Sequence, residues 1–151
     1  MSLEQLAYET SARALTEQES TLNELRARTG TLLTAASLVA SFLGGRAIDL
    51  EGLSIFNVVG VIAYLTTIAV SVYLLAPKAG LEFAIRGSEA YEYFVRGGAD
   101  LDEAHRTLAY WIDEKHAENK RRIDVLVILF TAACLSFVPE VVSWSLSLAL
   151  H

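Results

Sequence analysis

Polar residues that could carry chemistry recur inside long apolar stretches of the sequence. In the stretch that follows Ser54 they are spaced alternately three and four residues apart, which places them on one side of a helix: Asn57, Gly60, Tyr64, Thr67 and Ser71. Glu140 follows Pro139 in the last apolar stretch. Such residues either hydrogen-bond packed membrane helices together or line an aqueous pore, where a ring of carboxylates would favour cations. Packing and pore lining remain open for the five residues of the stripe. For Glu140 the alternatives are pore lining and an interfacial residue that ends the helix.

A second stripe of small and hydroxyl-bearing residues lies in the first apolar stretch. It consists of Thr34, Ser37, Ser41 and Gly44, again at helical spacing. One chain with three helices encloses little volume. A pore would therefore have to form between several copies of the chain, and the sequence does not indicate which stretch would line it.

Basic residues gather just before the last apolar stretch. Lys120, Arg121 and Arg122 are consecutive, and Arg106 precedes them on the same expected helix. A cluster in this place contacts anionic lipid and fixes orientation. Repeated around an oligomer it would also form a basic ring that could hold a phosphate-bearing ligand, because arginine pairs well with phosphate. We take these four residues as candidate ligand-binding residues.

The sequence carries none of the common catalytic motifs. It has no glycine-rich phosphate loop, no GxSxG, no HExxH and no cysteine–histidine pairing. His105 and His116 are eleven residues apart, whereas a helical metal site needs closer ligands. Cys134 is the one cysteine, so it forms neither a disulfide nor a cysteine-based zinc site. We predict a protein that is not an enzyme and uses no metal or cofactor.

The apolar residues concentrate in three charge-free runs. In the 151 residues, 53% are hydrophobic and 20% charged. The runs are 29–45, 52–77 and the stretch after Asp124. About 20 helical residues cross a bilayer, so the sequence predicts an all-α membrane protein with spans at 29–45, 52–77 and 123–142. A soluble helical bundle is disfavoured because the second run has no charged face, and a signal peptide because the first run begins too far from the N-terminus.

The distribution of lysine and arginine predicts the orientation of the chain. With three spans and a cytoplasmic N-terminus, eleven of the twelve basic residues lie on the cytoplasmic side, and only Arg46 lies outside. This is the bias expected of a multi-pass protein of a plasma membrane. We therefore expect a short outer loop between the first two spans, a cytoplasmic segment at 78–122 and a short outer C-terminal tail.

The cytoplasmic parts are expected to be helical. Residues 2–28 read as one helix that continues into the first span, with Leu15, Leu22, Leu25 and Leu32 at helical spacing. In 78–122, Gly97-Gly98 predicts a break, and Asp100 followed by Glu103 resembles a capping box. An apolar stripe follows and is expected to pack against the N-terminal helix within a single domain, 1–151: Leu101, Ala104, Leu108 and Trp111.

The order of these segments resembles a family of small membrane proteins. A charged helix leads into "RTGTLLTAASLVASFLGG", a short loop and a second span follow, and a helical segment leads into "HAENKRRIDVLVILFTAACLSFVPEVV". This layout is similar to SLATT-type domains and to the transmembrane effectors of cyclic-nucleotide systems in bacterial antiphage defence. Glu118-Asn119 before the basic start of the last span is the most suggestive detail.

The resemblance implies a function and partners that the residues alone do not. It implies a homo-oligomer, most simply a homotetramer, that opens or disrupts the bacterial inner membrane and so causes abortive infection. Control would come from a nucleotide or oligonucleotide ligand made by a companion nucleotidyltransferase. The alternative is a membrane-anchored scaffold or regulatory protein without a pore.

Overall fold

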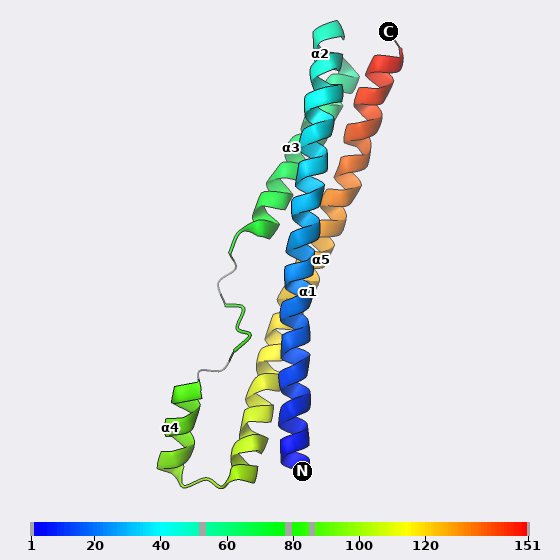
Figure 1. The fold of residues 1–151 in the computed structure, drawn as a ribbon. Coiled ribbons are helices and arrows are strands. Elements are labelled where there is room, and N and C mark those ends of the chain that lie inside the picture. Colours follow the sequence, from blue (N-terminus) through cyan, green and yellow to red (C-terminus); the bar gives the residue numbers. More distant parts are fainter. Residues whose placement is uncertain (1, 52–53, 78–79, 85–86, 151) are drawn as a thin grey trace. The chain divides into compact units, whose positions relative to one another are not determined.

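The structure is a computed structural model that describes residues 2–51, 54–77, 80–84 and 87–150. These residues form helices and connecting segments, with no strand among them. Figure 1 shows the elements in order. They are α1 (Leu3–Val39), the π-helix η1 (Ala40–Gly44), α2 (Gly45–Glu51), α3 (Ile55–Leu75), α4 (Gly87–Gly97) and α5 (Leu101–Ala149).

The described residues divide into two compact units. The first, called here the charged unit, contains the described residues of Met1–Asn23 and Lys78–Asp124. The second, the spanning unit, contains those of Glu24–Pro77 and Val125–His151. Helices α1 and α5 each contribute residues to both units, so the expected continuity of the N-terminal helix into the first apolar run is present.

Three helices are long and apolar enough to cross a membrane. They cover Leu3–Leu50, Ile55–Leu75 and Leu101–Ala149. Each overlaps one of the apolar runs of the sequence, which agrees with a multi-pass membrane protein. Hydroxyl side chains in the first of them donate hydrogen bonds to carbonyls one turn earlier in their own helix, Thr34 to Gly30 at 2.9 Å and Ser37 to Leu33 at 2.8 Å. This bonding makes hydroxyls tolerable in an apolar helix.

The π-helix η1 interrupts the first apolar run, which sequence reasoning did not anticipate. Its hydrogen bonds join residues five apart, as from the Gly45 amide to the Ala40 carbonyl, so the turn holds one extra residue. Ahead of it, the buried positions Thr29 and Ala36 lie seven residues apart. After it the next buried position is Gly44, eight residues beyond Ala36. The extra residue has shifted the buried face.

Side chains cap the starts of α3 and α5. The Ser54 hydroxyl accepts a hydrogen bond from the Asn57 amide at 3.2 Å, in the manner of an N-cap. The Asp100 carboxylate accepts one from the Glu103 amide at 2.8 Å, which confirms the predicted cap. The preceding break at Gly98 is also present, since that glycine has φ +65°.

Helix α5 continues through Pro139 to Ala149, past the predicted end of the span at 142. Proline lacks the amide hydrogen of a helical bond, but neighbouring helices and hydroxyls tolerate it within membrane spans. Along α5 the buried residues recur every seven positions: Ile112, Asn119, Leu126, Ala133, Glu140 and Ser147. This is the heptad period of left-handed helix packing, and we call these positions the α5 seam.

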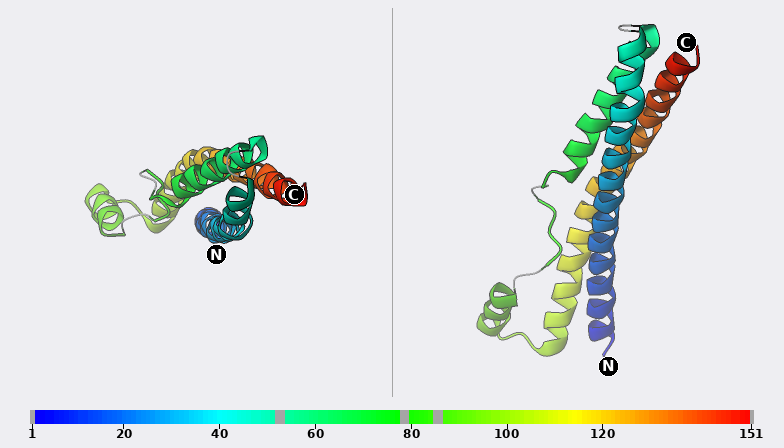
Figure 2. Two further views of the ribbon diagram at one scale, coloured as in Figure 1. Left: turned by 90° about the horizontal axis from the view of Figure 1, so that it is seen from above. Right: turned by 45° about the horizontal axis from the view of Figure 1, so that its top comes forward.

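In the charged unit, α1 and α5 run parallel. The Ser2 hydroxyl donates to the Asp102 carboxylate at 2.7 Å. Farther along, the Gln18 amide group donates to the His116 carbonyl at 2.9 Å. Leu15 and Leu22 are buried, as the spacing of leucines predicted. Figure 2 shows these parts of the two helices side by side.

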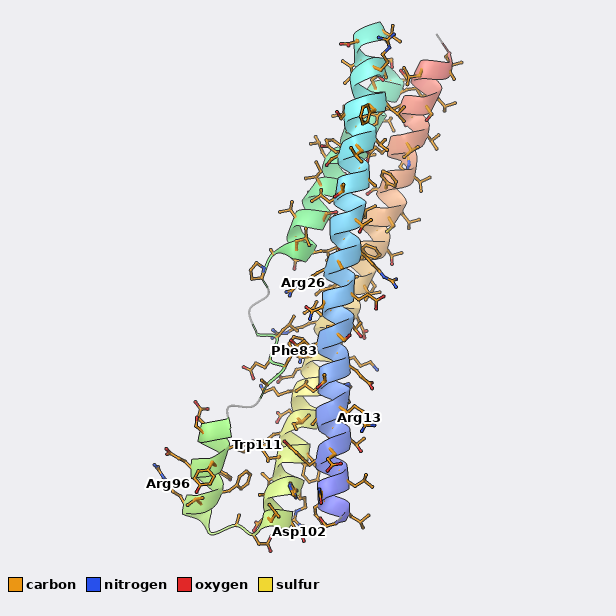
Figure 3. The ribbon with its side chains drawn as sticks, in the orientation of Figure 1. Arg13, Arg26, Phe83, Arg96, Asp102 and Trp111 are labelled. Atoms are coloured by element: carbon orange, nitrogen blue, oxygen red, sulfur yellow. The ribbon has the colours of Figure 1, made fainter. Side chains whose placement is uncertain are left out.

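The apolar stripe predicted on α5 is only partly the buried one. Leu101 is 72% exposed, and the buried residues are Ala109 and Ile112. Trp111 instead packs against α4, with its ring centroid 5.4 Å from that of Tyr93 and 6.1 Å from that of Phe94. Figure 3 labels Trp111 on the side of α5 that faces α4. The sequence predicted that Trp111 packs against α1. In the structure it packs against the aromatic residues of α4.

Candidate functional site

The polar stripe of α3 lies inside the spanning unit of one chain. Asn57 is 1% exposed, Thr67 and Ser71 are fully buried, and Gly60 is buried as well. Tyr64 is half-buried. The remaining surface of α3 is mostly apolar and includes Ile55, Val58, Ile62 and Leu65, with Thr66 as an exposed hydroxyl bonded to the Ile62 carbonyl. Helix α3 therefore presents its polar stripe to η1, α2 and α5 and its apolar side to the outside.

Hydrogen bonds pair this stripe with neighbouring helices. Asn57 donates to the Ala47 carbonyl at 3.3 Å and accepts from the Ser147 hydroxyl at 3.0 Å. Farther along α3, the hydroxyl oxygens of Thr67 and Ser136 lie 2.8 Å apart. These pairs show that α3 and α5 are antiparallel, and interhelical bonds of this kind stabilise membrane bundles by about 0.6 kcal/mol each.

Trp144 fills the space that two glycines leave. Its indole is 2% exposed. A Cβ atom built on Gly44 would lie 2.8 Å from the indole Cζ2, and one on Gly60 would lie 2.7 Å from the indole Cε2. Both distances are too short for a real side chain, so glycine is required on each facing helix. The ring also tilts against Tyr64, with centroids 6.1 Å apart.

Glu140 occupies the α5 seam one turn before Trp144. It is fully buried, and neither carboxylate oxygen has a hydrogen-bond partner among the described residues. The hydroxyl of Ser71 and the indole N–H of Trp144 likewise have none. The sequence pointed to Glu140 as a costly carboxylate, but its alternative role as an interfacial residue at a helix end does not match this burial within a continuous helix.

The stripe in the first apolar run is divided by the π-helix. Thr34, Ser37 and Ser41 are exposed on the outside of the spanning unit, whereas Gly44 is buried against Trp144. The two predicted stripes thus have opposite surroundings within one chain. The residues of α3 are inside the bundle, and the hydroxyls of α1 and η1 face its surroundings.

The four candidate ligand-binding residues do not form one site within a chain. Arg106 lines a groove of about 680 Å³ between residues 3–14 of α1 and residues 106–116 of α5, with Leu3, Leu6 and Tyr110 among its other walls. Lys120 lines a smaller hollow of about 230 Å³ with Gln18 and Thr21. Sixteen residues separate Arg106 from Arg122 on one helix, which corresponds to roughly 24 Å.

The side chain of Arg122 lies against Gly80. A Cβ atom on that glycine would meet the Arg122 guanidinium, and Gly80 also has φ +83°, which favours glycine. Arg121 is exposed. Their binding of one ligand remains a prediction that would require residues from several copies.

Asn119 has a structural role that sequence reasoning missed. It is 1% exposed and belongs to the α5 seam. Its side-chain amide donates to the Glu82 carbonyl at 2.8 Å, and its side-chain oxygen accepts from the Glu82 amide at 3.3 Å. Asn119 thereby holds the non-helical segment at 81–84 through both backbone groups of one residue. No spacing signal could have paired two residues so far apart in sequence.

Lys115 supports the same segment. Its ammonium nitrogen lies 3.3 Å from a carboxylate oxygen of Glu82 and 3.3 Å from one of Glu118. Hydrogen bonds to Glu82 and then to Glu118 raise the pKa of Lys115 above its ordinary value. Lys115 is already paired with two carboxylates, so the hollow between α4 and α5 offers little to an anion. That hollow is about 670 Å³ and includes Glu89 and Glu114.

The described residues contain no group of three or more His, Cys, Asp or Glu side chains that could hold a metal ion. His105 stacks on Tyr8, with ring centroids 5.5 Å apart, and His116 accepts the Gln18 hydrogen bond through its backbone carbonyl. Cys134 is a free thiol. The chain matches no protein-family model, no curated protein and no solved structure.

Proposed function

We propose that this chain is a membrane effector that assembles into a homo-oligomeric, nucleotide-regulated ion channel. The channel, most simply a tetramer, would depolarise the bacterial inner membrane in antiphage defence. The observation that carries the proposal is the exposed row of hydroxyls on α1 and η1, Thr34, Ser37 and Ser41. It stands out on a span whose other exposed residues include Leu38 and Phe42. An oligomer that turned these rows toward its axis would surround a polar path.

The buried stripe of α3 would take part only if the bundle opened. In the closed packing, Asn57 and Thr67 are paired with residues of α5. A ligand that favoured a rearranged packing would break these pairs and present the α3 stripe and Glu140 to the lumen, which requires unequal affinity for the two states. The family resemblance and the basic residues of α5 support a nucleotide or oligonucleotide as that ligand.

The proposed orientation places the N-terminus in the cytoplasm and the C-terminus outside. Eleven of twelve basic residues support it. A reporter that is active only in the cytoplasm should be active when inserted at Ala99 and inactive when fused after the C-terminus. Activity at both positions would contradict the three-span topology.

Conductance and cysteine accessibility test the channel. In a Cys134→Ala background, purified protein in planar bilayers should show discrete current steps that respond to a panel of cyclic nucleotides and oligonucleotides. A membrane-impermeant thiosulfonate reagent should then reduce the current through Ser37→Cys. Leu65→Cys is the matched control, because Leu65 is 57% exposed on the apolar side of α3 and should remain protected by lipid.

A membrane-anchored scaffold is the second candidate. The hydrogen bonds that pair the α3 stripe within one chain favour it, because a self-contained bundle needs no water-filled path. Absence of current steps with every nucleotide tested, together with unimpaired growth on overexpression, would decide for the scaffold. A deregulated channel would instead depolarise the cells and stop growth.

A further inference from the structure

Glu140 combines complete burial with the absence of any partner. Its exposed fraction is 0%, and both carboxylate oxygens lack a hydrogen-bond donor among the described residues. It lies in the α5 seam, where Ala133 and Ser147 occupy the equivalent positions one heptad away on either side. The side chain therefore points into the spanning unit and not toward lipid.

The facing elements supply no charge that could neutralise a carboxylate. From Thr29 to Gly45, α1 and η1 contain no titratable residue, and α3 contains only Tyr64 and Tyr73. Tyr73 is 54% exposed. On α5 itself, the only other titratable side chain from Val125 to Ala149 is Cys134. On α2, the charged side chains of Arg46 and Asp49 are both exposed.

A bound metal ion does not fit these surroundings. Hard cations need several oxygen ligands, and no group of acidic side chains able to hold a metal occurs among the described residues. An ionised carboxylate without a partner in a low-dielectric interior carries a large desolvation penalty, and protonation is the usual way in which such a group loses its charge. A proton is the one cation that needs no further ligands.

We infer that Glu140 is a proton-binding site within the membrane-spanning bundle, occupied at neutral pH in the closed packing. The bound proton lets α1, α3 and α5 pack around a carboxyl group. Its release would leave an unpaired negative charge at the level of Trp144 and so favour separation of the helices. The inference concerns the state of one side chain and stands whether or not the chain conducts ions.

Infrared spectroscopy of protein reconstituted in lipid at pH 7 tests this inference. A protonated carboxyl has a carbonyl stretching band separate from the bands of carboxylates and amides. The spectrum of the unmodified chain minus that of Glu140→Gln should contain this band. Its intensity should correspond to one carboxyl group per chain, out of the 18 acidic residues of the sequence. The control is Glu17→Gln, which removes an exposed glutamate and should leave the band unchanged.

A second measurement needs no variant, which matters if Glu140→Gln fails to fold. Dicyclohexylcarbodiimide enters bilayers and adds to protonated carboxyl groups, so mass spectrometry of the treated unmodified protein should find the adduct on Glu140. A difference spectrum without the carboxyl band would overturn the inference. So would an adduct found on exposed glutamates and absent from Glu140. Neither readout depends on conductance, so failure here is distinguishable from failure of the proposed channel.

Discussion

We expect the replacement of Trp144 by alanine to lower the free energy of unfolding by about 3 kcal/mol. The indole is 2% exposed between Gly44 and Gly60, and those glycines have no side chains that could fill the space left behind. Loss of a buried aromatic side chain in soluble cores costs about 3–5 kcal/mol. We expect the lower end of this range, because the unfolded helices remain in detergent and the indole is never transferred to water. The cost then comes mainly from the packing contacts that are lost.

The measurement is unfolding in detergent micelles by added sodium dodecyl sulfate, followed by helical circular dichroism. Trp111→Ala is the matched control, since Trp111 is 37% exposed in the charged unit. The midpoint of the unfolding transition should fall to a much lower concentration of sodium dodecyl sulfate for Trp144→Ala than for Trp111→Ala. Equal shifts would mean that the space around the indole collapses and that the two glycines are not rigid boundaries.

A single methyl group on Gly60 should also destabilise the spanning unit, by about 1–3 kcal/mol. The new Cβ would lie 2.7 Å from the indole Cε2 and 2.8 Å from Cδ1, and the buried ring has little room to retreat. Alanine is otherwise the better helix former, by about 1 kcal/mol. The overpacking therefore has to exceed this gain for stability to fall.

Gly45→Ala separates the two contributions. A Cβ atom on Gly45 meets nothing within 4 Å, so this variant should show only the gain in helix propensity. In a Trp144→Phe background, the smaller ring should reduce the loss caused by Gly60→Ala. If Gly60→Ala destabilised the chain equally in both backgrounds, the indole would not be the cause. The same micelle titration measures all the variants.

The sequence predicts the elements of this fold well and their contacts less well. The apolar runs and the basic residues that flank them indicate the three long helices, and Asp100 with Glu103 indicates where α5 begins. Length and capping act locally, so they can be deduced from neighbouring residues. The choice between Leu101 and Ile112 as buried residues depends on α4, because Trp111 contacts the aromatic residues of that helix. The spacing of residues along α5 does not show which of them face α4 and which face α1.

In the candidate site, too, the positions along a helix could be predicted from the sequence, whereas the partners on other helices could not. Helical spacing correctly placed Asn57, Gly60, Thr67 and Ser71 on one side of α3, since their common burial follows from a regular helix. Their partners, such as Ser147 for Asn57, are 90 residues away and follow only from how the helices pack. Whether these residues ever line a pore remains a prediction. The role of Asn119 was out of reach because its partner is the backbone of Glu82, whose sequence identity is immaterial to the bond.

The π-helix has a consequence for how this chain should be aligned with its relatives. With regular α-helical geometry, the residue seven positions after Ala36 would face the indole of Trp144, and that residue is Leu43. The extra residue in Ala40–Gly44 delivers Gly44 there in its place. In a homologue one residue shorter in this stretch, regular α-helical geometry would bring the residue aligned with Gly44 to the indole, so the contact would be kept without the π-helix. A chain of the present length with a regular α-helix there would instead need a glycine at position 43 or a smaller ring at position 144. The extra residue and the π-helix should therefore be gained or lost together in evolution.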